Sequence, residues 1–430
     1  MSLMKIKDLF HFEKGGLQSS KCTPGEFDFI TAAAEWKTHN EFSHECEALI
    51  FAAAASGSLG RTHYVNGKFV SSDLCFIITP KDPVKYPIDL KFYHLIFQAF
   101  KDEIVRNTKA GTSKEAIGLT AFGKYELPYF DIAKQQEVKE QFVTAQESTI
   151  GLDSELTHQL DLVKQLRQAF LREAMQGKLV PQDENDEPAS VLLEKIKAEK
   201  ERLIKEKKIK KQKPLPPITE DEIPFEIPEN WVWCRLGELA SIVRGGSPRP
   251  AGDPRYYGGE IPFLKVGDLT GYEGKFCTTH TYTIKEAGLY KTRSVKANTL
   301  MLTNSGATLG VPRICTFPTT FNDGIAAFLG IENLNKEFLF YFLREKSDYF
   351  LAEASRGQGQ PNLNTDIISY TLHALPPLSE QQRIVAKLDE LMAYCDELEA
   401  SIKESQQQNE QLLQQVLREA LEPKEKEVTG

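Results

Sequence analysis

The chain has 430 residues, of which 41% are hydrophobic and 26% are charged, and its net charge is −9. These values are typical of a globular protein with two or three domains, each large enough to bury a core. The longest apolar run has eight residues, 48–55, whereas a membrane span needs about 18. We therefore expect a cytoplasmic protein without a membrane partner.

The net charge is weak evidence about nucleic-acid binding, and the cysteine and histidine pattern indicates how the thiols and any metal site should be interpreted. The net charge of −9 argues against a protein that coats nucleic acid non-specifically, although local basic faces remain compatible with it. The seven cysteines include no Cys-x-x-Cys pair and the eight histidines no metal-ligand spacing, so the sequence predicts free thiols and no metal site.

Residues 1–130 are predicted to form a β-rich first domain with irregular loops. Short apolar runs at 27–30, 49–53 and 74–78 are separated by turn residues. The same pattern returns at 229–373, where the corresponding runs are 261–266, 299–303 and 325–329.

Residues 131–180 are predicted to form a long helix, because apolar side chains recur with alternating spacings of four and three. This spacing is typical of the seam of a coiled coil. The predicted seam comprises Val138, Phe142, Leu152, Leu156, Val163, Leu166 and Phe170.

Residues 181–228 are expected to connect the two halves as a charged helix followed by a Pro-rich linker. The basic run 207–211 is more typical of a solvated helix end than of a phosphate contact.

Residues 374–424 are predicted to form a second long helix, before a tail at 425–430. Its seam comprises Ile384, Leu388, Leu391, Leu398, Ile402, Leu412 and Val416. This seam repeats that of the first helix at an offset of 246 residues, and Gly15–Gly16 recurs as Gly245–Gly246 at an offset of 230. The sequence therefore predicts a tandem duplication in which each copy ends in a long helix.

Several motifs resemble one protein family. They are Pro228–Trp231 with Leu236–Leu239, Gly357–Leu363, and Leu375–Leu378 with Glu380–Gln382 before the second long helix. Together they resemble the specificity subunit of a type I restriction-modification enzyme, over essentially the whole chain. The first copy departs from the pattern, since it lacks the Pro-x-x-Trp lead-in and enters its helix through Leu127-Pro128-Tyr129-Phe130.

The resemblance implies a fold of the α/β (α+β) class. Two pseudo-twofold-related target recognition domains would be separated by two long antiparallel coiled-coil helices. Each domain would read one half of a bipartite, asymmetric site in double-stranded DNA. The helix pair would set the spacer between the halves and dock two methyltransferase subunits, and restriction/translocase subunits would join through the complex.

Candidates for DNA contact are residue types that bind phosphate or base edges, and those of the second domain lie in Gly- or Pro-punctuated segments expected to be loops. In the first domain they are Lys14, Lys21, Lys37, Arg61, His63, Lys68 and Lys109. In the second domain they are Arg244, Arg249, Arg255, Lys265, Asn304, Arg313, Arg356, Gln358, Gln360 and Asn362. Each is equally compatible with an ordinary solvent-exposed or structural role.

The sequence contains no catalytic motif that we recognise, neither a phosphate-binding Gly-rich loop nor the Asn-Pro-Pro-Tyr of adenine methyltransferases. We therefore expect a non-catalytic subunit, with S-adenosylmethionine, ATP and Mg on its partners and no cofactor in this chain. Two alternatives stay open. A stand-alone DNA-modifying enzyme would bind a cofactor itself, and a coiled-coil scaffold would have no affinity for DNA.

Overall fold

The computed structural model describes residues 2–54, 57–110, 115–306, 308–355 and 362–421. The chain divides into two compact units, 1–159 with 401–430, and 160–400. Each unit contains one β-rich region together with parts of two long helices, α5 (Ile132–Met175) and α12 (Leu378–Leu421). The fold is of the mixed α/β class that the sequence predicts.

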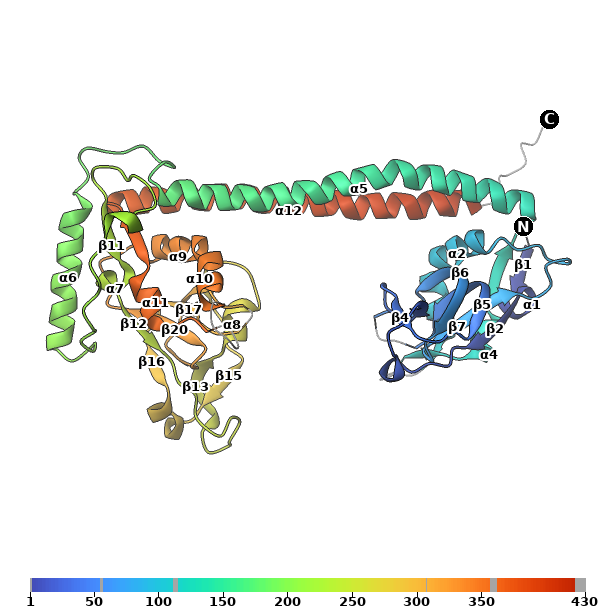
Figure 1. Ribbon diagram of the computed structural model, residues 1–430, viewed down its shortest axis with the longest axis horizontal. Coiled ribbons are helices and arrows are strands. Elements are labelled where there is room, and N and C mark those ends of the chain that lie inside the picture. Colours follow the sequence, from blue (N-terminus) through green and yellow to red (C-terminus); the bar gives the residue numbers. More distant parts are fainter. Residues whose placement is uncertain (1, 55–56, 111–114, 307, 356–361, 422–430) are drawn as a thin grey trace. The chain divides into compact units, whose positions relative to one another are not determined.

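The first unit is built on a six-stranded sheet (Figure 1). Its strands, in spatial order, are β2 (Phe10–Lys14), β7 (Cys75–Pro80), β5 (His44–Ala52), β6 (Thr62–Ser71), β3 (Phe27–Ile30) and β4 (Lys37–His39). Only the β3–β6 pair is parallel among these neighbours. Two small pairs complete the strands, β1 (Ser2–Lys5) with β10 (Glu126–Tyr129), and β8 (Lys109–Ala110) with β9 (Ala116–Ile117).

Helices cover one face of this sheet. They are α1 (Ile6–Leu9), α2 (Leu90–Ala99), α3 (Lys101–Thr108) and α4 (Leu119–Lys124), whereas the short 3₁₀ turn η1 (Ser19–Lys21) follows β2 in the chain and is not part of this layer. Between them and the sheet lies an aromatic core in which Phe51, Phe97 and Phe122 are fully buried and in mutual ring contact. Val138 and Phe142 of α5 join the same cluster, so the first turns of the long helix are part of this core.

The second unit contains two larger sheets. The five-stranded sheet has the order β12 (Ser241–Arg244), β20 (Ile325–Leu329), β17 (Thr299–Thr303), β18 (Pro312–Cys315) and β14 (Phe276–Cys277). The four-stranded sheet has the order β15 (Tyr282–Ile284), β13 (Tyr257–Leu264), β19 (Thr319–Phe321) and β16 (Arg293–Val295). A separate pair joins β11 (Val232–Arg235) to β21 (Leu372–Leu375).

Between β11 and α12, the described residues of the second unit form six short helices, four of which have counterparts in the first unit. The six are α7 (Leu236–Leu239), α8 (Val266–Thr270), η3 (Glu286–Lys291), α9 (Lys336–Glu345), α10 (Ser347–Ala354) and α11 (Thr365–Tyr370). The β1–β10 pair with α1 corresponds to the β11–β21 pair with α7, and α2, α3 and α4 correspond to α9, α10 and α11. The internal repeat inferred from sequence is therefore also present in the order of the elements.

At the same place in both units, a glycine allows two backbone segments to pack closer than a side chain would permit. A side chain at Gly15 would place its Cβ 2.2 Å from the carbonyl oxygen of Ser72, and one at Gly245 would meet that of Asn322 at 2.2 Å. The amide of Gly15 donates to Cys75 and that of Gly245 to Ile325. Both glycines are thus required by backbone packing at the end of the second strand of each copy.

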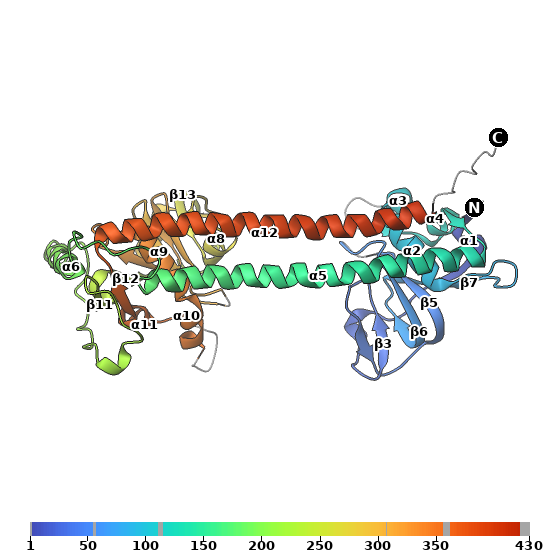
Figure 2. The same ribbon diagram turned by 90° about the horizontal axis from the view of Figure 1, so that it is seen from above.

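Within each unit, the segments of α5 and α12 lie side by side (Figures 1 and 2). In the first unit, Asn409 Nδ2 lies 3.4 Å from the carbonyl oxygen of Thr149, and Gln406 Nε2 lies 3.4 Å from Thr157 Oγ1. As the residue number rises on one helix it falls on the other, so these segments are antiparallel. In the second unit, Arg167 Nη2 lies 2.7 Å from Asp396 Oδ1 and 3.0 Å from Glu399 Oε2.

Most predicted seam positions are buried or half-buried, but four are not. The buried or half-buried residues are Val138, Phe142, Leu156, Val163, Phe170, Ile384, Leu388, Leu391, Ile402 and Val416. The seam prediction is wrong for Leu152, Leu166, Leu398 and Leu412, whose side chains are 38–54% exposed.

The error at three of these positions is a shift of one residue, which rotates a helical side chain by about 100°. Arg167, Glu399 and Leu413 are half-buried in place of the preceding leucines. Arg167 turns inward because it pairs with carboxylates on α12, and Leu413 packs against the cluster of Val138 and Phe142. Nothing in the structure explains the exposure of Leu152.

The segment between the repeats is fixed to the second unit. It contains α6 (Ala189–Lys205) and a short turn, η2 (Glu220–Glu222). Both ends of the segment meet at Glu380 of α12, whose carboxylate accepts from Gln182 Nε2 at 2.6 Å and from Trp231 Nε1 at 2.9 Å. Among the described helices, none is both long enough and apolar enough to cross a membrane.

Candidate nucleic-acid interface

Basic and aromatic residues alternate in two segments of the second unit, 244–257 and 288–293. The segments touch through glycines, because a Cβ on Gly246 would lie 2.4 Å from the carbonyl oxygen of Lys291 and one on Gly288 would lie 3.3 Å from that of Tyr256. They therefore form one surface, which we name the Tyr256 patch. It consists of Arg244, Arg249, Arg255, Tyr256, Tyr290, Lys291 and Arg293.

The Tyr256 patch is positively charged although the chain is acidic. Two of its five cations pair with carboxylates, Arg255 with Asp253 and Arg249 with Asp323. Arg255 Nη2 lies 2.6 Å from Asp253 Oδ2, and Arg249 Nη2 lies 3.7 Å from Asp323 Oδ2. The side chains of Arg255 and Arg249 are 72% and 70% exposed, so they can still reach a polyanion.

Hydrogen bonds to backbone position the other two arginines. Arg244 Nε donates to the carbonyl of Asp323 at 2.5 Å, and Arg293 Nε donates to the carbonyl of Arg244 at 2.7 Å. These bonds link the ends of β12 and β16 and leave further N–H donors on each guanidinium. Tyr257 stabilises the loop that carries Arg249 and Arg255, since its hydroxyl donates to the carbonyl of Pro248 at 2.9 Å.

The aromatic residues of the Tyr256 patch lie next to its cations. The Arg255 guanidinium carbon is 5.5 Å from the ring centroid of Tyr256, and Lys291 Nζ is 5.2 Å from that of Tyr290, a ring that is 73% exposed. A hydrogen bond with Tyr256, followed by the charge of Lys291, lowers the pKa of the Tyr290 hydroxyl. An exposed ring such as that of Tyr290, placed among cations, is suited to stacking on bases while its neighbours hold phosphates.

A second exposed pair lies where β13 meets β15. Lys265 Nζ is 3.5 Å from the ring centroid of Tyr282, and that ring is 42% exposed. Lys265 itself is half-buried and occupies the N-cap position before α8. This predicted candidate can therefore still present its ammonium group to solvent.

The candidates of the first unit are distributed over several elements. Lys14 at the end of β2, Lys21 on η1 and Lys37 on β4 are exposed. Lys68 Nζ lies 4.8 Å from the ring centroid of Phe42, and Lys109 forms a 2.7 Å ion pair with Glu115.

Arg61 and His63 are half-buried on β6 and the turn before it. Arg61 Nη1 donates to the carbonyl of Ala32 at 2.8 Å and to Ser58 Oγ at 3.2 Å. His63 Nδ1 accepts from Trp36 Nε1 at 3.1 Å. The structure brings these two candidates together in the lining of one cavity.

The predictions for Asn304 and Arg313 are wrong, because both were expected on exposed loops. Asn304 is fully buried at the end of β17, and its backbone carbonyl accepts from Leu363 at 2.7 Å. Arg313 is 6% exposed within β18, where its guanidinium donates to the carbonyls of Pro312 and Tyr272. Burial lowers the pKa of Arg313. Neither side chain is placed to touch DNA.

The remaining candidates fall in or beside the Gly- and Gln-rich sequence 357–360. Arg356, Gln358 and Gln360 lie outside the described residues. Asn362 is exposed and forms a bridge with Ser305.

Sequence reasoning missed Tyr256, Tyr290, Lys291 and Arg293. The signal was present, because a basic residue adjoins a tyrosine in both Arg255-Tyr256 and Tyr290-Lys291. The contact between the two segments could not be read from the sequence, since it depends on how the loops pack through Gly246 and Gly288.

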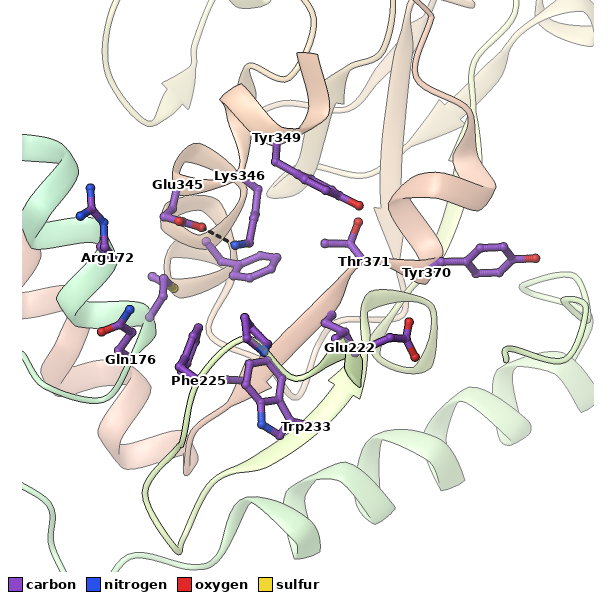
Figure 3. Close-up of a pocket in the computed structure, with 15 residues that line it drawn as sticks. Arg172, Gln176, Glu222, Phe225, Trp233, Glu345, Lys346, Tyr349, Tyr370 and Thr371 are labelled. Atoms are coloured by element: carbon purple, nitrogen blue, oxygen red, sulfur yellow. Dashed lines mark ion pairs between the residues drawn. The ribbon is translucent and has the colours of Figure 1, made fainter. Parts of the chain in front are cut away.

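A cavity of about 300 Å³ lies in the second unit between the end of α5, α9 and the linker (Figure 3). Phe225 and Trp233 form part of its wall, with their ring centroids 5.1 Å apart. Its carboxylates are matched by cations, because Glu345 pairs with Lys346 at 3.0 Å and Glu222 pairs with Arg235 at 2.8 Å. Arg172 also lines the cavity, so its described lining holds two cations and two carboxylates and gives no preference for an anionic or a cationic ligand.

The model of the type I restriction modification DNA specificity domain matches residues 1–161 and 228–408. The specificity subunit of the Escherichia coli type I restriction enzyme EcoAI is 33% identical over 252 residues, which cover 57% of this chain and 42% of that protein. The specificity subunit of Escherichia coli EcoEI is 32% identical over 257 residues, with coverages of 56% and 42%. The matches thus span less than half the length of these two relatives.

A solved structure shares the fold. It belongs to work on complex assembly and conformational transition of the type I restriction-modification system, and it matches with a TM-score of 0.56 at 16% identity, covering 98% of this chain and 97% of that one. The family model covers both copies of the repeat and well over half of the residues. The chain therefore belongs to the family of type I restriction modification DNA specificity domains.

Proposed function

We propose that this chain is the DNA sequence-recognition subunit of a type I restriction-modification complex. One observation carries the proposal, namely that the family model matches twice, once over each copy of a duplicated fold. Two copies with a common frame and different surfaces are suited to two different readers. Each copy would read one half of a bipartite, asymmetric DNA site.

The second reader would use the Tyr256 patch. Its arginines and lysine would contact phosphates, which fix register, while guanidinium groups reaching a groove would form bidentate hydrogen bonds to guanine. Tyr256 and Tyr290 would add stacking or sugar contacts. In the first reader, Lys14, Lys21 and Lys37 are the exposed candidates.

The two long helices would form the spacer between the readers as an antiparallel coiled coil. Each has 44 residues, which corresponds to roughly 66 Å at 1.5 Å per residue. Half-sites on one face of a duplex lie about 34 Å apart or a multiple of it. A pair of packed helices of this length could hold two readers at such a separation, and its exposed faces would dock two methyltransferase subunits.

The chain itself would be non-catalytic and cytoplasmic. We propose that S-adenosylmethionine is bound by the methyltransferase subunits, and that ATP and Mg are used by the restriction/translocase subunits of the complex. In this arrangement, the present chain supplies only the binding energy that selects the site.

An exchange of one reader tests the proposal. Residues 229–373 would be replaced by the equivalent segment of a relative, and the chain would be expressed with its modification subunits. Methylated adenines would be mapped by single-molecule sequencing. We expect one half of the methylated site to change and the other half to stay.

Other results would contradict it. An unchanged methylation pattern would show that this segment does not read DNA, as expected of a scaffold. Methylation of DNA by the purified chain alone, with S-adenosylmethionine, would identify a stand-alone enzyme instead.

A further inference from the structure

The first unit contains a cavity of about 600 Å³ between β6, α2 and α5. Its volume lies in the range of about 300–1,000 Å³ that is usual for sites of small organic ligands. The residues that determine its chemistry are Trp36, Arg61, His63, Tyr64, Lys91 and Lys139.

The lining of this cavity favours an anion. It includes three cations and, among the described residues that line it, no carboxylate. Lys139 is neutralised by Asp89, which lies outside the lining. The Arg61 guanidinium is held by a carbonyl and a hydroxyl rather than by an anion, and exposed Lys91 lies 5.4 Å from the ring centroid of Tyr64. The cavity of Figure 3 differs, because its lining includes two glutamates.

The same cavity has an aromatic wall that is fixed in orientation. Trp36 Nε1 donates to His63 Nδ1 at 3.1 Å, with the two ring planes at 80°, and the indole remains 38% exposed. Burial lowers the pKa of His63, so its imidazole is neutral at pH 7 and can accept this bond. His63 is thus a positioning residue that holds the Trp36 ring for contact with a flat ligand.

We propose that this cavity binds a nucleotide, with its base against Trp36 and its phosphate near Lys91 and Arg61. A flat ring system that carries a phosphate satisfies both the aromatic wall and the excess of positive charge. The nucleotide could be a free mononucleotide or one unit of a DNA strand. Only the second source rests on the function proposed above.

The test is calorimetric titration of the full chain with each of the four deoxynucleoside monophosphates and with the matching nucleosides. We expect the nucleotides to bind and Lys91→Gln to weaken binding roughly tenfold or more, since a charge-assisted contact is lost. Trp36→Ala should abolish binding. The matched control is Lys85→Gln, because Lys85 also lies over a tyrosine ring, 5.1 Å from the centroid of Tyr86, but outside the cavity. It should bind as the wild type does.

Three results would overturn the proposal. They are no binding of any mononucleotide, nucleosides that bind as tightly as nucleotides, and binding that survives both Lys91→Gln and Trp36→Ala. Circular dichroism of each variant would show that the fold is kept. His63→Phe is a second test of the aromatic wall, because it removes the acceptor that orients Trp36 and should weaken binding without the loss of a charge.

Competition distinguishes the two sources. If saturating mononucleotide displaces a duplex carrying the recognised site, the cavity lies on the DNA path; if both bind together, the free nucleotide is the ligand. If the chain binds its DNA site but no mononucleotide, the proposal of nucleotide binding in the cavity is wrong and the proposed DNA recognition is unaffected. A chain that binds nucleotides through Lys91 but no DNA refutes only the function proposed above.

Discussion

Gln135 and Gln381 make equivalent hydrogen bonds at equivalent places in the two units, 246 residues apart. Each is fully buried near the start of a long helix. Gln135 Oε1 accepts from the backbone N–H of Asp89 at 2.8 Å, and Gln381 Oε1 accepts from that of Asn335 at 3.1 Å. Asp89 and Asn335 are themselves 246 residues apart, and each caps the N-terminus of the next helix. Each glutamine also donates to the carbonyl five residues before it.

The first prediction concerns the stability of this joint. Gln381→Ala should lower the free energy of unfolding by about 1–3 kcal/mol, because a buried N–H and a buried carbonyl lose their partners. Urea denaturation of the full chain measures the change. Gln382→Ala is the control, since Gln382 is exposed next to it, and it should be nearly neutral. Equal losses in the two variants would contradict the assigned role.

The second prediction concerns acid stability. His373 is fully buried against Phe342, with ring centroids 4.3 Å apart. Burial, with a smaller contribution from Lys346, lowers its pKa from 6.5 to about 3. Below pH 6.5 the unfolded chain therefore binds a proton that the folded chain does not, and stability falls as the pH falls toward 3.

We expect His373→Phe to reduce this loss. The urea midpoint of the wild type should fall between pH 7 and pH 5 by more than that of the variant. The exposed His11→Phe serves as the control and should behave like the wild type. If His373→Phe and the wild type fall equally, buried His373 does not contribute to the pH dependence.

The third prediction tests the helix register. Met392 is 9% exposed, whereas Leu398, which the sequence placed in the seam, is 48% exposed. Met392→Ala should cost about 2–5 kcal/mol as a core truncation, and Leu398→Ala should cost under about 1 kcal/mol because little area returns to water. Thermal and urea unfolding measure both. A larger loss at Leu398 would support the original seam.

The fourth prediction concerns the Tyr256 patch. Arg255→Ala, Lys291→Ala and Arg293→Ala should each weaken binding to DNA and reduce the slope of log K against log salt by about 0.9 for each lost phosphate contact. Fluorescence anisotropy with a duplex over a salt series measures both quantities. The control is Lys208→Ala, because Lys208 is exposed on the linker and pairs with Glu206. A slope unchanged in all three variants would place the DNA elsewhere.

The helices and the repeat could be predicted because their signals are local and periodic. The spacing of apolar residues gave both long helices, and recurring Gly, Pro and Gln residues gave the offset between the copies. The side-chain register was less secure, because Arg167 is polar yet turns inward to reach Asp396 and Glu399. Periodicity of apolar residues cannot report an inward ion pair.

The candidate interface was harder to predict, since exposure of an arginine depends on its neighbours in space. Arg244 and Arg313 both lie in strands of four residues, but Arg244 ends an edge strand, whereas Arg313 lies in β18 between β17 and β14. Arg313 is buried because its strand has a neighbour on both sides, whereas the strand of Arg244 has a neighbour on one side only among the described strands. The four-residue sequence of a strand does not show how many neighbours it will have. The same limit explains why Asn304 was chosen and Tyr290 was overlooked.

The convergence of Gln182 and Trp231 on Glu380 has a practical consequence. Both ends of the segment 182–231 are hydrogen-bonded to the carboxylate of Glu380. A backbone break between exposed Lys210 and Lys211 would therefore leave many tertiary contacts intact. Asp186 would still bind Arg383 across the break, and Lys200 would still hold the carbonyl of Gly237. Fragments 1–210 and 211–430, produced separately, should therefore reassemble by complementation into a functional protein.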